Sequence, residues 1–270
     1  MNIKPLYAKN GYRYDRRVTA MMIEDMIFDP ILAMKVLLGI TTPPHQELRV
    51  LTMWTTGFTL DDSGFSTGKS FTFAAISAIR SMLFPNRISG VLSGNFRQGK
   101  LIFGYYDKWV NTSSIFKNSL EVSNGKPSLV HGSDAHIASF RGGSKIRVLP
   151  PNTSNNADTL RSERWNDGYI DEWVIFPDYT IITKTIFGRC TEANKYDTCP
   201  VRQNHIHLGS PPQFQHSPSY SLVQSFDAEI EAGNSNYARL TFNYRHVPRT
   251  LKYKGLVNYR VISTLQKTNP

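Results

Sequence analysis

The chain has 270 residues, of which 40% are hydrophobic and 19% charged, and this composition excludes a disordered or collagen-like protein. The 31 Lys and Arg residues outnumber the 21 Asp and Glu residues, and the resulting net charge of +10 favours a polyanion such as nucleic acid as a partner. Two cysteines argue against a disulfide scaffold or a zinc site. No uncharged apolar stretch is long enough to cross a membrane, and the first residues hold no signal peptide.

The first half of the chain begins with two helical patterns. A helix is expected over Arg17–Leu38, kinked or divided at Pro30, followed by a short amphipathic helix over Gln46–Thr55. In that second helix the spacing predicts one apolar face with Leu48, Leu51 and Trp54. The other expected helices are Lys69–Phe84, Phe96–Trp109 and Ser219–Ala232, and the expected strands are Gly57–Asp61, Ile88–Leu92, Ile137–Phe140, Lys145–Leu149, Gly168–Asp171, Asn204–Leu208 and Tyr237–Tyr244.

Strands that alternate with helices indicate an α/β fold with a mostly parallel sheet. The composition changes once, near Ala232. After Glu231 the chain holds no acidic residue but seven Lys and Arg residues, interleaved with Tyr and Phe. Two interpretations of this basic tail stay open. In the first, the tail binds along the phosphate backbone of a nucleic acid. In the second, it is a solvated edge hairpin whose Lys and Arg residues protect it from aggregation.

A phosphate-binding pattern lies between the strand expected at Gly57–Asp61 and the following helix. Small residues in such a loop let backbone N–H groups turn onto phosphate oxygens, and the helix N-terminus adds positive charge. A Lys supplies a mobile cation, and the next hydroxyl is a Mg²⁺ ligand. The first position departs from the usual Gly, and a plain helix start is the alternative. The motif reads Ser63-Gly64-Phe65-Ser66-Thr67-Gly68-Lys69-Ser70.

A pair of acids follows a short apolar strand, in Tyr169-Ile170-Asp171-Glu172. Ligands of open α/β sheets bind at the carboxyl ends of strands. In a nucleotidase the first acid, Asp171, holds the magnesium shell, and the second, Glu172, activates the attacking water. The alternative is a strand that runs into a helix N-terminus, where the helix dipole favours acids.

Four further residues have two interpretations each. The amide of Gln46 can pair with two edge atoms of adenine, or it is an exposed residue at a helix start. Ser210 follows a strand beside the expected phosphate site, where it senses the γ-phosphate or positions water, or it is a turn residue before Pro211. His205 and His207 alternate on one strand face without an evident third metal ligand, so packing or solvent exposure is expected. Core or interface positions are expected for Trp54, Trp109, Trp165 and Trp173.

Taken in order, segments from Asp29 to about Gln213 resemble the ATPase domain of the large terminase subunits of tailed bacteriophages, the motors that package viral DNA. Two departures stand out: Ser162 occupies the position of a usual Gly, and the phosphate loop lacks the Arg that the family often has there. The matching segments are Asp29-Pro30 with a helix and then Pro44-His45-Gln46 (adenine recognition), Ser63 to Ser70 (Walker A), Arg97-Gln98-Gly99-Lys100 (the next helix), Gly143 to Ile146 and Asp158 to Ser162 (the strand and Arg loop), Asp171-Glu172 (Walker B) and Leu208 to Pro211 (the coupling motif).

The resemblance implies a P-loop NTPase of the additional-strand catalytic-Glu type, with a mostly parallel central sheet flanked by helices and a small lid subdomain. Residues 1–213 would form the ATPase core with an N-terminal helical segment, and residues 214–270 a lid- or linker-like basic tail. The family usually adds a nuclease domain with clustered acids. Because the last 39 residues hold no acid, we expect that nuclease domain to be absent from this chain.

The implied function is an ATP-hydrolysing motor that moves double-stranded DNA into a viral procapsid. ATP would bind on Gln46, the loop from Ser63 to Ser70, and Ser210, and Mg²⁺ on Ser70 and Asp171. Implied partners are the portal protein, the small terminase subunit and other copies in a pentameric ring, with no membrane. The protein would act in the host cytoplasm, transiently at the portal vertex. The alternatives are a helicase-like ATPase and a non-catalytic nucleotide-binding assembly module, and the second acid favours turnover over the module.

The phosphate loop offers no Arg to stabilise the charge that develops on the γ-phosphate. Arg161 lies 11 residues before Glu172, and the matching Arg of ring-forming terminases is thought to reach a neighbour's ATP. We therefore expect Arg161 to be catalytic, as an arginine finger acting in trans, with Arg164 as a secondary candidate. In the alternative, Arg161 pairs with Glu163 or Asp167 on a solvated loop.

Overall fold

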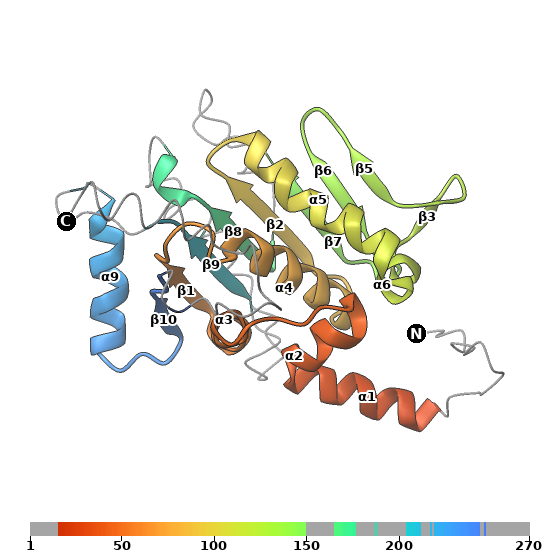
Figure 1. Cartoon of the computed structure of the whole chain (residues 1–270), viewed down its shortest axis with the longest axis horizontal. Coiled ribbons are helices and arrows are strands. Elements are labelled where there is room, and N and C mark those ends of the chain that lie inside the picture. Colours follow the sequence, from red (N-terminus) through yellow and green to blue (C-terminus); the bar gives the residue numbers. More distant parts are fainter. Residues whose placement is uncertain are drawn as a thin grey trace.

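A computed structural model describes residues 16–149, 165–176, 187, 204–211, 217, 219–243 and 246. Within this part of the chain, eight strands form one sheet in the order β10-β1-β9-β8-β2-β7-β6-β5, and the six from β10 to β7 are parallel (Figure 1). Strand β6 runs antiparallel to β7, and the edge strand β5 runs antiparallel to β6. The strands are β1 (Phe58–Asp61), β2 (Ile88–Ser93), β5 (Leu129–His131), β6 (His136–Ser139), β7 (Lys145–Leu149), β8 (Asp167–Asp171), β9 (His205–Gly209) and β10 (Tyr237–Leu240), beside a small ladder of β3 (Val122–Ser123) and β4 (Lys126–Pro127).

The predicted α/β architecture is confirmed, since helices cover both faces of this mostly parallel sheet. One core cluster joins the sheet to the helices from α1 to α6, and a second joins it to α9, Trp165 and Trp173. All four tryptophans are buried, as expected. No described helix is long and apolar enough to cross a membrane. The helices are α1 (Arg16–Phe28), α2 (Pro30–Ala33), the π-turn η1 (Met34–Leu38), α3 (Pro44–Thr55), α4 (Lys69–Leu83), α5 (Phe96–Thr112), α6 (Ser114–Ser119), the 3₁₀ turn η2 (Trp173–Ile175) and α9 (Tyr220–Glu231).

The first predicted helix is divided at Pro30. Asp29 separates α1 from α2, and its carboxylate accepts the backbone N–H groups of Ile31 and Leu32 at 3.0 and 2.9 Å. This is an N-cap followed by Pro at the first helical position, where the missing N–H costs nothing.

The predicted apolar face of α3 is wrong. Leu48 and Leu51 are 53% and 43% exposed, and of the three predicted residues only Trp54 is buried. The face that packs inward also carries Gln46 and Arg49, which lie against the phosphate loop (residues 63–70). The prediction chose the wrong side because the buried face mixes polar residues against the loop with Val50, Met53 and Trp54 in the apolar core.

The C-terminal strand β10 lies beside β1, with Leu60 opposite Arg239. Residues 237–240 belong to the predicted basic tail, yet they form the edge strand of the main sheet. Arg239 binds Asp62 and Asp227, at 2.7 Å each, so this cation serves an internal ion-pair network. The predicted boundary between residues 213 and 214 stays a prediction.

A buried ion cluster fixes the start of β8. Asp167 accepts hydrogen bonds from Arg80 at 3.2 Å and from Arg87 at 2.9 and 2.8 Å. Burial alone would raise the pKa of this carboxyl, but the two guanidinium groups hold it below its usual range. The cluster connects the last turn of α4 and the start of β2 to the central strand β8.

We expect Asp167→Asn to lower the free energy of unfolding by about 3–5 kcal/mol, because it removes the buried carboxylate that forms ion pairs with both guanidinium groups. Urea unfolding at neutral pH measures this loss. Asp25→Asn, on the exposed side of α1, is the matched control and should unfold like the wild type. Equal stability of Asp167→Asn and the wild type would contradict the role of the cluster.

The two histidines of β9 are buried in the core. Nδ1 of His205 lies 3.0 Å from the carbonyl of Met53, whereas His207 packs against Tyr169 and neither of its ring nitrogens has a protein partner. Burial, assisted by the charge of Arg80, lowers the pKa of His207 to about 3. Among the described residues no cluster of three potential ligands could hold a metal, so packing is the role that fits.

A folded-state pKa below the unfolded value means that the unfolded chain binds the proton first. The free energy of unfolding should therefore fall as the pH drops from about 6.5 toward 3, by up to about 1.4 kcal/mol per pH unit. His207→Leu should flatten this slope in urea unfolding measured at several pH values. Identical slopes for the variant and the wild type would show that His207 does not carry the effect.

Candidate functional site

The candidate site lies where three neighbouring parallel strands end. The last residues of β1 and β8, Asp61 and Asp171, both pair in register with Gly209 of β9. The phosphate loop leaves β1 at this edge and leads into α4, which crosses the face of the sheet (Figure 1). The structure therefore brings the predicted loop, the predicted acids and the end of β9 together.

The phosphate loop is shaped by two residues in the left-handed region, Ser66 with φ 61° and Gly68 with φ 90°. A side chain at Gly68 would also clash with the amide nitrogen of Gln46, which occupies the position of a Cβ. Gly64 donates its N–H to the carbonyl of Phe242 at 2.7 Å, and Phe65 is 72% exposed at the tip of the loop. The loop is thus fixed at its base and open at its tip.

Lys69, the first residue of α4, folds back across the loop. Its ammonium group donates to the carbonyls of Ser63 at 2.7 Å and Gly64 at 3.1 Å. Burial lowers the pKa of Lys69, while nearby carboxylates, Asp61 foremost, oppose that shift.

The acid pair lies at the end of β8, where Asp171 is the last residue of the strand and Glu172 follows it. The Ser70 hydroxyl donates to Oδ2 of Asp171 at 2.5 Å, and Oδ1 of Asp171 is buried without a hydrogen-bond partner. Burial raises the pKa of Asp171. Glu172 has a φ of 54°, which turns the chain sharply, and burial together with the charge of Asp171 raises its pKa.

A cavity of about 810 Å³ opens above the loop, a size typical of small-molecule sites. The loop with Lys69 and Ser70 forms one side of the cavity. The segment after η1 and the residues Tyr105 and Lys108 of α5 line the other sides, and Glu172 is also a lining residue. Asp171 is not among the lining residues, and its contact with Ser70 connects it to the loop side.

Two further predicted residues lie at this site. Gln46 lines the cavity, is 4% exposed, and donates from Nε2 to the carbonyl of Thr67 at 3.4 Å, so it is not an exposed residue at a helix start. Ser210 is buried, and its N–H donates to the carbonyl of Asp61 at 2.9 Å, next to the loop. Arg161 and Arg164 lie outside the described residues.

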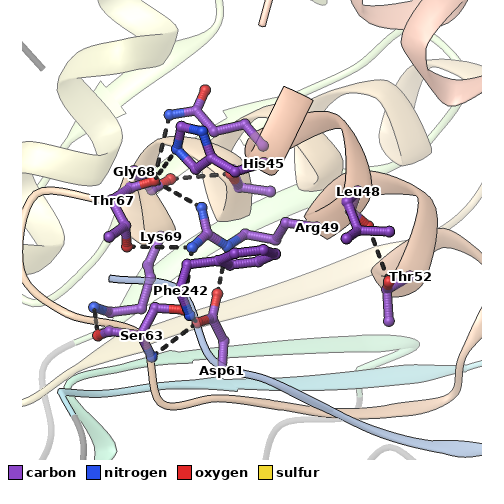
Figure 2. A network of polar contacts seen from close by, with 12 residues as sticks. His45, Leu48, Arg49, Thr52, Asp61, Ser63, Thr67, Gly68, Lys69 and Phe242 are labelled. Carbon is purple, nitrogen blue, oxygen red and sulfur yellow. Dashed lines mark hydrogen bonds and ion pairs between the residues drawn. The ribbon is translucent and has the colours of Figure 1, made fainter. Parts of the chain in front are cut away.

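Sequence analysis missed Arg49 and Asp61, which form a buried ion pair directly behind the loop (Figure 2). Arg49 comes from the middle of α3 and Asp61 from the end of β1. A signal existed: a phosphate loop without an Arg of its own, and an Arg one helical turn after Gln46. Only the packing of α3 against the loop shows that these two features belong together.

The sheet order, the loop before α4 and the acids at the end of β8 define an α/β fold with a mostly parallel sheet and a strand–loop–helix unit at the candidate site. Among solved structures, it is similar to the large terminase ATPase domain of Thermus phage P74-26, with a TM-score of 0.52, 16% identity, and coverage of 77% of this chain and 83% of that one. It is also similar to the large terminase of bacteriophage HK97, with a TM-score of 0.56 and 12% identity over 83% of this chain and 44% of that one.

The large terminase of a thermophilic bacteriophage, solved in complex with ATP-gamma-S, gives a TM-score of 0.51 and 12% identity. The match covers 85% of this chain and 50% of that one, so the chain spans about half of this protein and of the HK97 protein. No protein-family model and no curated sequence matches the chain. At these identities the likeness establishes the fold, and at that level the resemblance to large terminase ATPase domains is confirmed.

Proposed function

We propose that this chain is an ATP-hydrolysing motor domain that moves double-stranded DNA into a viral procapsid. The observation that carries the proposal is the convergence of Lys69, Ser70 and Glu172 on one cavity of nucleotide size, with Asp171 bound to Ser70. A site that only bound nucleotide would not need a second acid beside the first. The likeness to large terminase ATPase domains supports the coupling to DNA.

The residues present fit a magnesium ion. Oδ1 of Asp171 is a buried carboxylate oxygen without a partner, and the Ser70 hydroxyl lies on the other oxygen of the same group. Oxygen atoms of this kind are the ligands that Mg²⁺ prefers. Ser70 and Asp171 would hold the ion, which supplies positive charge to the phosphate oxygens.

The protein groups have separate tasks in this scheme. Lys69 exchanges its two loop carbonyls for phosphate oxygens, because the ammonium group already points across the loop. Glu172 takes a proton from the attacking water, and its raised pKa makes it a better base than an ordinary Glu. Gln46 binds adenine and Ser210 lies close to the γ-phosphate.

The same likeness supports a proposal for the wider setting of the motor. The net charge of +10 suits a polyanionic track such as duplex DNA. We further propose a pentameric ring of copies in which Arg161 acts on the neighbour's ATP, with residues 214–270 acting as lid or linker. The portal protein and the small terminase subunit would be partners, at the portal vertex in the host cytoplasm.

Glu172→Gln keeps the size of the side chain and removes its basicity. It should still bind ATP with Mg²⁺, while hydrolysis falls by at least about 100-fold, and Lys69→Ala should lose binding as well. Asp171→Asn should weaken binding in the presence of Mg²⁺ more than in its absence. The measurements are phosphate release with and without duplex DNA, and equilibrium binding of a fluorescent ATP analogue.

Glu121→Gln and Lys117→Ala change exposed residues away from the cavity and serve as matched controls. Wild-type hydrolysis by folded Glu172→Gln would overturn the assignment of the base. Strand separation by the wild type would instead indicate a helicase-like ATPase. Nucleotide binding without any turnover would indicate an assembly module.

A further inference from the structure

Arg49 contacts the first residue of the phosphate loop, Ser63, and a residue in its middle, Thr67. Its Nη1 donates to the carbonyl of Thr67 at 2.8 Å, and its Nη2 lies 3.2 Å from the Thr67 hydroxyl and 3.4 Å from the hydroxyl of Ser63. Its Nε forms the ion pair with Asp61. The side chain is fully buried, and Figure 2 shows it lying between α3 and the loop.

The carbonyl of Thr67 is surrounded by donors from one helix. Besides Arg49, Nε2 of His45 lies 3.2 Å from it and Nε2 of Gln46 lies 3.4 Å from it. A trans peptide directs its C=O and the next N–H in opposite directions. By holding this carbonyl toward α3, the three side chains therefore direct the N–H of Gly68 away from α3, as a phosphate-binding loop requires.

The positive charge of Arg49 is paired within the protein and does not face the cavity. Asp61 neutralises it and also accepts the N–H and the hydroxyl of Ser63, the N–H at 3.1 Å. Arg49 does not line the cavity. It therefore acts on the reacting groups only through the loop, which makes it a positioning residue and not a catalytic one.

The segment that follows β10 closes this arrangement from the other side. The ring of Phe242 lies 5.0 Å from the guanidinium carbon of Arg49, within the range of a cation–π contact. The backbone N–H of Phe242 donates to the Ser63 hydroxyl at 2.9 Å, and its carbonyl accepts from Gly64 at 2.7 Å. The segment after β10 thus contacts both the loop and Arg49, the residue that braces it.

We propose that Arg49 positions the phosphate loop for nucleotide and that Phe242 connects this brace to the segment that follows β10, so that a shift of that segment changes nucleotide affinity. The proposal rests on the proposed role of the loop in binding nucleotide. It adds a route by which the part of the chain after residue 213 acts on the site without entering the cavity.

Arg49→Lys keeps the positive charge but cannot make the forked contacts of a guanidinium group. Because one or two hydrogen bonds would be lost, we expect a fluorescent ATP analogue to bind roughly 10-fold more weakly. The kcat at saturating ATP should change by less than about 3-fold. Phe242→Leu keeps both backbone bonds and should weaken binding by a few-fold. Arg141→Lys, an exposed residue beyond the cavity, is the control.

Hydrogen exchange of the full chain without nucleotide gives a second readout, in which peptides covering residues 62–70 should exchange faster in both variants than in the wild type and in Arg141→Lys. If Arg49→Lys does not fold, Phe242→Leu decides the question by the same two measurements. Unchanged affinity and unchanged exchange in folded variants overturn the proposal while Lys69→Ala still loses nucleotide. If Lys69→Ala also binds normally, the proposed function fails instead.

Discussion

The site depends on how charge is balanced at the carboxyl ends of β1 and β8. Two carboxylates, Asp61 and Asp171, are buried there on strands that both pair with β9. A buried charge is costly unless it is paired. Asp61 is satisfied internally by Arg49 and Ser63. Asp171 has one oxygen on Ser70, and its other oxygen has no side-chain partner. One acid therefore stabilises the loop, and the other suits the proposed metal site.

This division has a consequence for rigidity. The base of the loop is connected to α3, β1 and the segment after β10, whereas its tip, with Phe65, is exposed. Nucleotide would meet a loop whose backbone donors are already directed, so little ordering would be needed on binding. The Asp167 cluster does similar work at the opposite end of β8, where Arg80 and Arg87 fix the strand that carries the acids.

Sequence predicted well what depends on local pattern. The loop between β1 and α4, the strand before the acid pair and the division at Pro30 follow from residue types at short spacing, and the structure has each of them. The buried face of α3 was predicted wrongly, because it mixes apolar core residues with polar residues that pack against a loop further along the chain. Arg49 and Asp61 were missed for the same reason: their importance lies in a contact between a helix and a strand end, and no spacing along the chain encodes it.

The central claim is that this cavity binds a nucleoside triphosphate with magnesium. Titration calorimetry of the whole chain with ATP-gamma-S tests it directly, with Mg²⁺ and then with a chelator in its place. The account predicts one site per chain and binding that is clearly tighter with Mg²⁺, because Asp171 needs the ion to satisfy its free oxygen. Absence of binding, or equal affinity in the two conditions, would contradict it.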